Sequence, residues 1–216
     1  MKKYILFDLD GTIIDPKEGI TKSVAYALNK FEIKVDNLNE LCKFIGPPLK
    51  DSFIEYYNFS EDEAEKAIKY YREYFADRGI YENKLYKGFE DILISLKENN
   101  KVLIVATSKP TIFATKILEN FNLSKYFTFV SGSNFDGSRV RKSEVIQYAL
   151  EINNIKDLSE VVMIGDRKHD IYGAKEVGLD SIGVLYGYGD YEELYNSGAN
   201  YIVNSVEELR ASIMDI

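Results

Sequence analysis

Short, largely apolar runs are the feature that most limits how this chain can fold. They occupy residues 4–7, 102–106, 127–130 and 161–164, and a fifth run is expected at 181–185. Strands that are apolar on both faces are typical of a parallel sheet covered by helices. The helically periodic segments at 110–121 and 142–153 would be the crossover helices. We therefore predict an α/β fold with a Rossmann-like, three-layer parallel-sheet core.

Residues 16–82 have a different texture, with helical periodicity and no strand pattern. Ile20, Val24 and Leu28 recur at helical spacing, and Ser60–Glu63 is a capping-box pattern that starts a long helix. This segment separates the first apolar run from the others. We therefore predict that residues 1–15 and 83–216 form the core domain and that residues 16–82 form an inserted, small, all-helical cap domain.

The composition limits the classes of function and partner. The chain has 216 residues, of which 45% are hydrophobic, so a sizeable core is expected. Its net charge of -8 argues against nucleic acid and acidic membrane surfaces as main partners. A single cysteine, Cys42, excludes an intrachain disulfide. With no signal-peptide core and no membrane-length apolar run, we expect a cytoplasmic protein. For its oligomeric state we expect a monomer or a weak dimer.

Polar residues gather where the apolar runs end, and ligands bind outside the carboxyl ends of strands in open parallel sheets. The first run is followed by Asp8, Asp10, Gly11 and Thr12, the second by Thr107, Ser108 and Lys109, the third by Gly132, Ser133, Arg139, Arg141 and Lys142, and the fourth by Gly165, Asp166, Arg167 and Asp170. Carboxylates suit Mg²⁺, which prefers oxygen ligands. Hydroxyls, backbone amides and a lysine suit a phosphate. No histidine or cysteine cluster is present for zinc.

Asp8 and Asp10 are two like charges at the end of a strand expected to be buried. This arrangement costs stability unless a cation lies between them or function requires it. A cation and a phosphate that share the site would make it tolerable. Asp8 is then a candidate nucleophile or metal ligand, and Asp10 is a candidate proton donor.

In order and strand placement, these motifs resemble those of the haloacid dehalogenase-like hydrolases. Phe7–Thr12 is similar to the first motif, Thr107 to the second, Lys142 to the third and Gly165–Asp170 to the fourth. The helical insertion resembles the family's cap of the first type. Phe44–Leu49 is similar to the cap loop of phosphoglycolate phosphatase-like and 5'-nucleotidase-like members. The resemblance implies a Mg²⁺-dependent phosphatase acting on a small phosphorylated metabolite, a nucleoside monophosphate or phosphoglycolate.

The resemblance also implies a role for each site residue. Asp8 would form an aspartyl-phosphate, while Asp10 would protonate the leaving oxygen and then deprotonate water. The predicted metal ligands are Asp8, the backbone carbonyl of Asp10, and Asp166, with Asp170 orienting Lys142 or a metal-bound water. The predicted phosphate-binding residues are Asp10, Gly11, Thr107, Ser108 and Lys142. The predicted specificity residues are Gly46, Pro47 and Lys109.

Several alternatives stay open at this level. Relatives often carry Lys-Pro at the third motif, whereas this chain reads Arg141-Lys142-Ser143, so Arg141 or Arg139 could supply the charge instead. The loop containing Gly46 either turns the chain or lines the substrate pocket. A phosphosugar mutase of the β-phosphoglucomutase type and a non-catalytic phosphoacceptor module are the rival functions. A dehalogenase would need neither a second acid nor a complete metal site.

Overall fold

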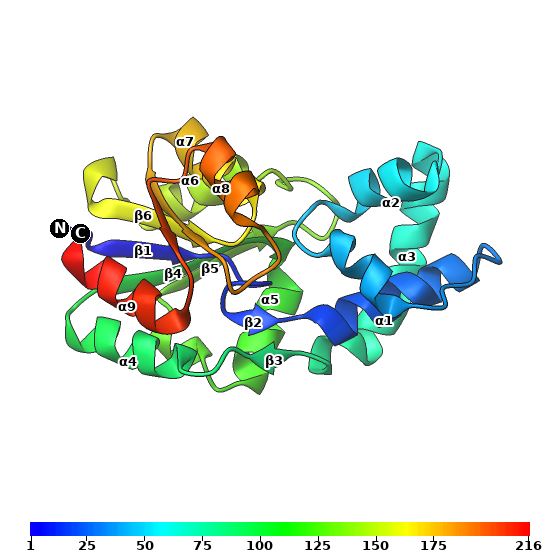
Figure 1. The fold of residues 1–216 in the computed structure, drawn as a ribbon, viewed down its shortest axis with the longest axis horizontal. Coiled ribbons are helices and arrows are strands. Elements are labelled where there is room, and N and C mark those ends of the chain that lie inside the picture. The colour runs from blue at the N-terminus through cyan, green and yellow to red at the C-terminus, as the bar shows by residue number, and fades with distance from the viewer. The chain divides into compact units, whose positions relative to one another are not determined.

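The structure, a computed structural model, describes residues 1–216 and divides the chain into two compact units (Figure 1). Unit 1 comprises Met1–Asp15 and Leu85–Ile216, and unit 2 comprises Pro16–Lys84. The two segments that connect the units are β2 (Ile14–Asp15) and β3 (Lys84–Leu85), which pair in a separate two-stranded sheet.

A six-stranded parallel sheet with the order β5-β4-β1-β6-β7-β8 forms the centre of unit 1. Its strands are β1 (Tyr4–Phe7), β4 (Val102–Pro110), β5 (Phe129–Ser133), β6 (Val161–Gly165), β7 (Asp180–Val184) and β8 (Tyr201–Val203). In the central strand, Tyr4 is opposite Val102 on one side and Val161 on the other. The order of strands reverses beside β1, and open α/β sheets bind their ligands at such a point.

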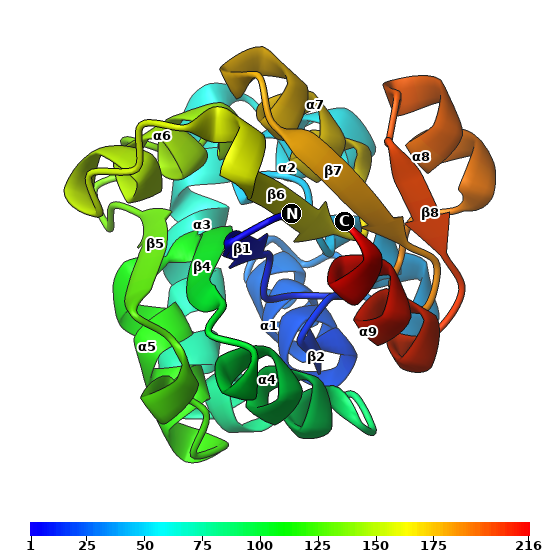
Figure 2. The same ribbon diagram turned by 90° about the vertical axis from the view of Figure 1, so that its left-hand side faces the viewer.

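Helices cover both faces of this sheet and give unit 1 three layers (Figures 1 and 2). One face carries α6 (Lys142–Ile152), α7 (Lys168–Val177) and α8 (Tyr191–Ser197), and the other carries α4 (Phe89–Glu98), α5 (Thr111–Asn120) and α9 (Val206–Asp215). Leu6, Ile104 and Met163 of the sheet pack with Val145 and Ala174 of the helices in a buried apolar cluster. The predicted fold class, a Rossmann-like α/β core with a helical insertion, is confirmed.

Strand boundaries differ from the expectations in two places. The strand expected at 127–130 lies at 129–133, because a short 3₁₀-helix, η3 (Ser124–Tyr126), occupies the preceding residues. The strand expected at 102–106 continues to Pro110. Another 3₁₀-helix, η4 (Leu158–Glu160), precedes β6. The three-residue strand β8 was not predicted, since so short a run carries no recognisable periodicity.

Helices also build unit 2. They are α1 (Lys17–Asn29), η1 (Leu38–Phe44), α2 (Leu49–Tyr57), α3 (Glu61–Asp77) and η2 (Gly79–Tyr81). The expected capping box starts α3: the backbone N of Glu63 donates to Ser60 Oγ at 3.3 Å, and the backbone N of Ser60 donates to the Glu63 carboxylate at 2.8 Å. Stacked and edge-on rings fill the interior, with the Phe53 ring 5.1 Å from Phe44 and 5.8 Å from Phe59. That unit 2 acts as a cap stays a prediction.

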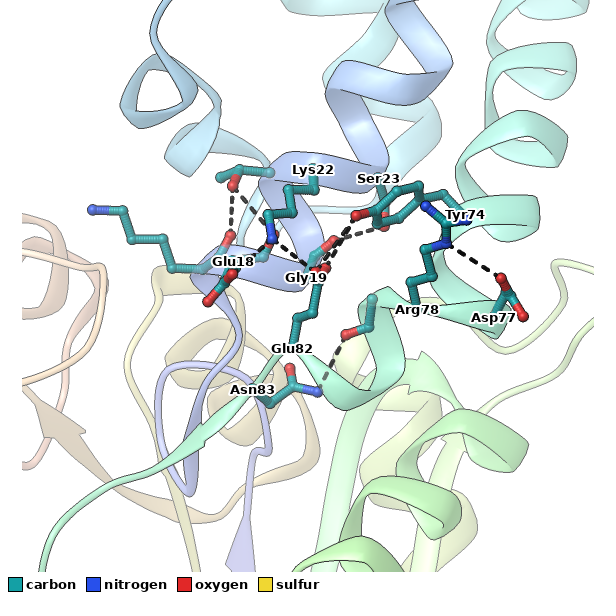
Figure 3. Close-up of polar contacts among 12 residues, drawn as sticks. Glu18, Gly19, Lys22, Ser23, Tyr74, Asp77, Arg78, Glu82 and Asn83 are labelled. Carbon is teal, nitrogen blue, oxygen red and sulfur yellow. Dashed lines mark hydrogen bonds and ion pairs between the residues drawn. The ribbon is translucent and has the colours of Figure 1, made fainter.

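The first turn of α1 and the segment after η2 are joined at the base of unit 2 (Figure 3). The backbone N of Gly19 donates to the carbonyl of Glu82 at 2.9 Å. Lys22 Nζ lies 2.7 Å from the Glu82 carboxylate and 2.6 Å from that of Glu18. A Cβ on Gly19 would lie only 2.2 Å from the carbonyl oxygen of Gly79. The two ends of unit 2 are therefore held together within that unit. None of the helices of the chain combines the length and apolar character needed to cross a membrane.

Candidate active site

Three buried carboxylates meet at the carboxyl edge of the unit 1 sheet. Asp8 directly follows β1, and Asp166 directly follows the neighbouring strand β6. Asp170 lies in the first turn of α7. One oxygen from each of the three lies within 4.8 Å of the others. Buried like charges at this spacing repel one another, so the cluster needs cations close by.

Lys142, the first residue of α6, supplies one such cation. Its Nζ lies 2.7 Å from Asp8 Oδ1 and 2.8 Å from Asp170 Oδ1, and it donates to the carbonyl of Ala106 at 3.0 Å. Burial disfavours the charged ammonium, but the carboxylates of Asp170 and Asp8 outweigh burial and raise the pKa of Lys142. The ammonium therefore stays protonated and bridges the two acids.

The two arginines considered for the same role have other partners. Arg141 lies on the surface and pairs with Glu176 at 3.2 Å. The guanidinium of Arg139 lies 3.7 Å from the ring centroid of Tyr148. Of the three cations, Lys142 is the one that contacts the carboxylate cluster.

Asp166 is fully buried and only partly hydrogen-bonded. Its Oδ2 accepts from the backbone N of Tyr188 at 2.8 Å, and its Oδ1 is buried without a hydrogen-bond partner in the protein. Burial, and then the charges of Asp170 and Asp8, raise the pKa of Asp166 well above its ordinary value of 3.8. A bound cation would satisfy such an oxygen and remove the repulsion.

The chemistry of the donor atoms fits a hard divalent cation. The carboxylate cluster offers oxygen ligands only, which suit Mg²⁺. The site has four buried carboxylates and two buried ammonium groups, on Asp8, Asp10, Asp166, Asp170, Lys109 and Lys142. When all are charged, two negative charges are left over, and one divalent cation would balance them.

Asp10 forms a second buried ion pair, with Lys109 at the end of β4. Lys109 Nζ contacts Asp10 Oδ2, whereas Asp10 Oδ1 is buried without a hydrogen-bond partner in the protein. Burial raises the pKa of Asp10, and the positive charge of Lys109 opposes that rise. A carboxyl group with a raised pKa is suited to giving and taking a proton near neutral pH.

The other predicted phosphate ligands lie at the same edge of the sheet. Thr107 is buried, and its Oγ1 accepts from the backbone N of Lys109 at 3.3 Å. Ser108 stands between them and is half-buried. Gly11 has a φ of 83°, and a Cβ there would lie 2.1 Å from Asp166 Oδ2. Only glycine therefore fits at this position. Its backbone N donates to the carbonyl of Ile14 at 2.8 Å, so this amide is not available to a phosphate as the sequence predicted.

Gly46 and Pro47 are the predicted site residues that belong to unit 2. They stand between η1 and α2, and Gly46 has a φ of 102°. A turn of the chain at this point follows from that geometry. Their proposed contact with a substrate stays a prediction.

The segment 186–189, Tyr-Gly-Tyr-Gly, belongs to the site and was missed from the sequence. Besides the bond from its backbone N to Asp166, Tyr188 donates its hydroxyl to the carboxylate of Asp15. A Cβ on Gly187 would lie 2.4 Å from Asp166 Cβ. This segment follows β7 after one residue, Leu185, so the strand-end rule, applied to that strand as well, would have found it.

Comparison with known proteins agrees with this arrangement. The family model for haloacid dehalogenase-like hydrolases matches residues 5–184. A 5'-nucleotidase from Pseudomonas aeruginosa is 44% identical over 190 residues, which cover 88% of this chain and 86% of that protein. The tyrosine-protein kinase PtkA of Mycobacterium tuberculosis is 34% identical over 214 residues, covering 98% and 72%. A phosphoglycolate phosphatase from Vibrio parahaemolyticus is 28% identical over 215 residues, covering 96% and 94%.

Among solved structures, a predicted phosphatase from Clostridium acetobutylicum is 56% identical and aligns over the whole of both chains with a TM-score of 0.98. The three relatives named above carry the names of enzymes, which argues against a non-catalytic phosphoacceptor module. None of the three is named as a mutase, and that alternative is not supported.

Proposed function

The chain belongs to the haloacid dehalogenase-like hydrolases and is a phosphatase, and we propose that it hydrolyses a small phosphate monoester through an aspartyl-phosphate formed on Asp8. One observation carries this proposal: the buried cluster in which Asp8 is paired with Lys142 and lies close to Asp166. Lys142, together with a cation held by Asp8 and Asp166, would let an anionic phosphate approach the nucleophilic carboxylate without prohibitive repulsion.

In the first step, a carboxylate oxygen of Asp8 bonds to phosphorus, and the bond between phosphorus and the ester oxygen breaks. Asp10 gives its proton to the departing oxygen, so the leaving group departs as a neutral alcohol. Lys142 holds Asp8 in position through their 2.7 Å contact and offsets part of the charge on the phosphate.

In the second step, a water oxygen attacks the phosphorus atom of the aspartyl-phosphate. Asp10, now ionised, takes a proton from that water, and the bond between phosphorus and the Asp8 oxygen breaks. The products are inorganic phosphate and the free carboxylate of Asp8. Asp10 is again protonated, so the enzyme is ready for another ester.

The remaining groups bind and neutralise charge. Mg²⁺, when bound, would be held by the side chains of Asp8 and Asp166 and by the carbonyl of Asp10, and would offset repulsion between the phosphate and the carboxylates. Asp170 orients Lys142 through their 2.8 Å contact. We expect phosphate oxygens to accept hydrogen bonds from the hydroxyl of Thr107 and from the backbone amide of Ser108, whereas the amide of Gly11 already donates to the carbonyl of Ile14 at 2.8 Å.

For the substrate we propose the nucleoside monophosphate class first, because the relative named as a 5'-nucleotidase is 44% identical. Phosphoglycolate is the second candidate, since a relative at 28% identity is named for it. Unit 2 would close over the site, exclude water and contact the leaving group, with Gly46 and Pro47 in its specificity loop.

The test is phosphate release from a panel of esters, with Mg²⁺ and with a chelator. The panel contains nucleoside monophosphates, phosphoglycolate, sugar phosphates, pyrophosphate and a phosphotyrosine peptide. We expect Mg²⁺-dependent release by the unchanged protein and by the exposed control Asp36→Asn, and none by Asp8→Asn. A folded protein that binds Mg²⁺ but releases phosphate from no ester would contradict the proposal.

A further inference from the structure

The two carboxylate oxygens of Asp10 have different environments. Oδ2 is held by the ammonium of Lys109, whose side chain is only 6% exposed. Oδ1 is buried and has no hydrogen-bond partner in the protein. A proton exchanged with a substrate therefore has one carboxylate oxygen available to it, and Lys109 decides which one.

The backbone that carries Lys109 has an irregular path that places its side chain at this contact. Ala106 pairs with Ser131, but the next pair joins Pro110 to Ser133, so three residues of β4 stand opposite one residue of β5. The strand therefore bulges at residues 107–109. Such bulges occur next to active sites, where they redirect a side chain.

Two local features hold the bulge in place. The residue opposite is Gly132, where a Cβ would lie 2.5 Å from the carbonyl oxygen of Lys109. The backbone N of Lys109 donates to Thr107 Oγ1 at 3.3 Å, and that of Gly132 donates to Thr111 Oγ1 at 3.1 Å. A buried lysine on a fixed bulge is costly unless its charge is used.

We propose that Lys109 is a positioning residue for Asp10: it holds Oδ2 and so turns Oδ1 toward the leaving oxygen of the ester. The proposal rests on the proposed function and deepens it. It differs from the role expected from the sequence, in which Lys109 would contact the substrate. Lys142 pairs with Asp8 and Asp170, whereas Lys109 is the lysine that pairs with Asp10.

The test compares two esters that differ in their need for an acid. The leaving oxygen of a nucleoside monophosphate is strongly basic and must be protonated as it departs. The phenolate of p-nitrophenyl phosphate is weakly basic and leaves without a proton. In Lys109→Met we expect kcat for the nucleotide to fall about 100-fold with KM within about 3-fold. The rate constant of the first-turnover burst of p-nitrophenolate should fall by less than about 10-fold.

The matched control is Lys101→Met, which removes another buried lysine, one residue before β4, whose Nζ donates to the carbonyl of Lys2. This control should keep the activity toward both esters. The double variant Asp10→Asn with Lys109→Met should be no slower than Asp10→Asn alone, because Lys109 acts through Asp10. If Lys109→Met does not fold, Lys109→Gln is put through the same comparison, with a smaller loss in the same direction.

Four results would overturn the inference. A raised KM with an unchanged kcat would make Lys109 a substrate-binding group. Equal losses for both esters, or additive losses in the double variant, would make it a structural residue or a phosphate ligand. A wild-type protein that hydrolyses neither ester would overturn the proposed function and this inference with it, and the wild-type measurement separates that outcome from the others.

Discussion

Among single residues, Lys142 is where burial and charge oppose each other most directly. An ammonium in this position loses its hydration, which disfavours the charged form. Contacts of 2.7 Å to Asp8 and 2.8 Å to Asp170 outweigh that loss and raise its pKa above the ordinary 10.5. A lysine whose pKa is raised by folding adds stability at pH values below its pKa in the unfolded chain. This stability is lost as pH rises through its pKa in the folded protein. It is therefore present in full at neutral pH.

Lys142→Met should damage both catalysis and stability. Two buried carboxylates would lose their shared cation, so we expect the free energy of unfolding to fall by about 3 kcal/mol. We expect kcat to fall at least about 100-fold, the usual loss when one electrostatic contact to the reacting group is removed. The measurements are urea unfolding and steady-state kinetics with the preferred ester.

The neighbouring residue provides the control for that experiment. Arg141→Met removes a side chain that is 69% exposed and paired only with Glu176 among the carboxylates near it. It should leave kcat and the urea midpoint close to those of the unchanged protein, because exposed ion pairs contribute little. Equal losses in the two variants would show that Lys142 has no special place in the site.

At the scale of elements, the bulge of β4 depends on the glycine that faces it. Gly132→Ala would place a methyl group 2.5 Å from the carbonyl oxygen of Lys109, a backbone atom that cannot rotate away. The bulge must then shift, and a small displacement of an acid is costly in rate. We expect kcat for the nucleotide to fall about 10-fold with little change in KM.

Gly183→Ala is the matched substitution on β7. Its added methyl group would lie 2.9 Å from Leu194 Cδ1, the flexible end of a side chain, so the site should stay intact and kcat should be kept. Steady-state kinetics with the same ester compare the two variants. A Gly132→Ala enzyme with unchanged kcat would mean that the bulge tolerates the methyl group and does not control Asp10.

The base of unit 2 contains both a close backbone contact and a partly exposed ion pair (Figure 3). Gly19→Ala would put a Cβ 2.2 Å from the carbonyl oxygen of Gly79, so α1 and η2 would be forced apart at a cost of about 2 kcal/mol. Lys22→Met removes contacts to Glu18 and Glu82, but these ion pairs are partly exposed to solvent and should matter less. Urea unfolding followed by circular dichroism compares them, and a larger loss in Lys22→Met would reverse this ranking.

Across the whole molecule, the net charge of -8 does not describe the site, where burial and pairing decide the charge of each group. Burial raises the pKa of Asp10, Asp166 and Asp170. When folding raises the pKa of an aspartate, the folded protein keeps a proton at pH values above 3.8, the ordinary aspartate pKa, where the unfolded chain has released it. The metal-free protein therefore loses stability as pH rises from about 4 through the raised values.

Mg²⁺ should reverse this loss, because it binds the ionised carboxylates. We expect saturating Mg²⁺ to raise Tm more at about pH 8 than at about pH 5.5, where protons compete with the metal. Thermal unfolding with Mg²⁺, with a chelator, and with NaCl at equal ionic strength tests this expectation. Asp166→Asn should lose most of the shift. The same Tm increase at both pH values would argue against binding at these carboxylates.

Patterns along the chain were sufficient to predict the α/β class, the helical insertion and the strand-end acids. They also placed Asp8 and Asp166 at the ends of strands, because short apolar runs and helical periodicity are properties of consecutive residues. That these two strands are neighbours comes from the structure. The extension of β4 into a bulge was not predicted, since only its pairing with β5 defines it. Tyr188 was missed because the strand-end rule was not applied to β7, and because its bond to Asp166 comes from the backbone, so its residue type alone gives no signal.

The sequence by itself therefore determined the fold class and the inventory of acids, hydroxyls and cations at one edge of the sheet. Only the tertiary structure decided which cation meets which acid. Lys142 and Asp8 are separated by 134 positions, and Lys109 and Asp10 by 99. No local pattern links residues so far apart. Strand order brings their backbones together, and side-chain reach and burial then select Lys142 over Arg141 and turn Lys109 toward Asp10.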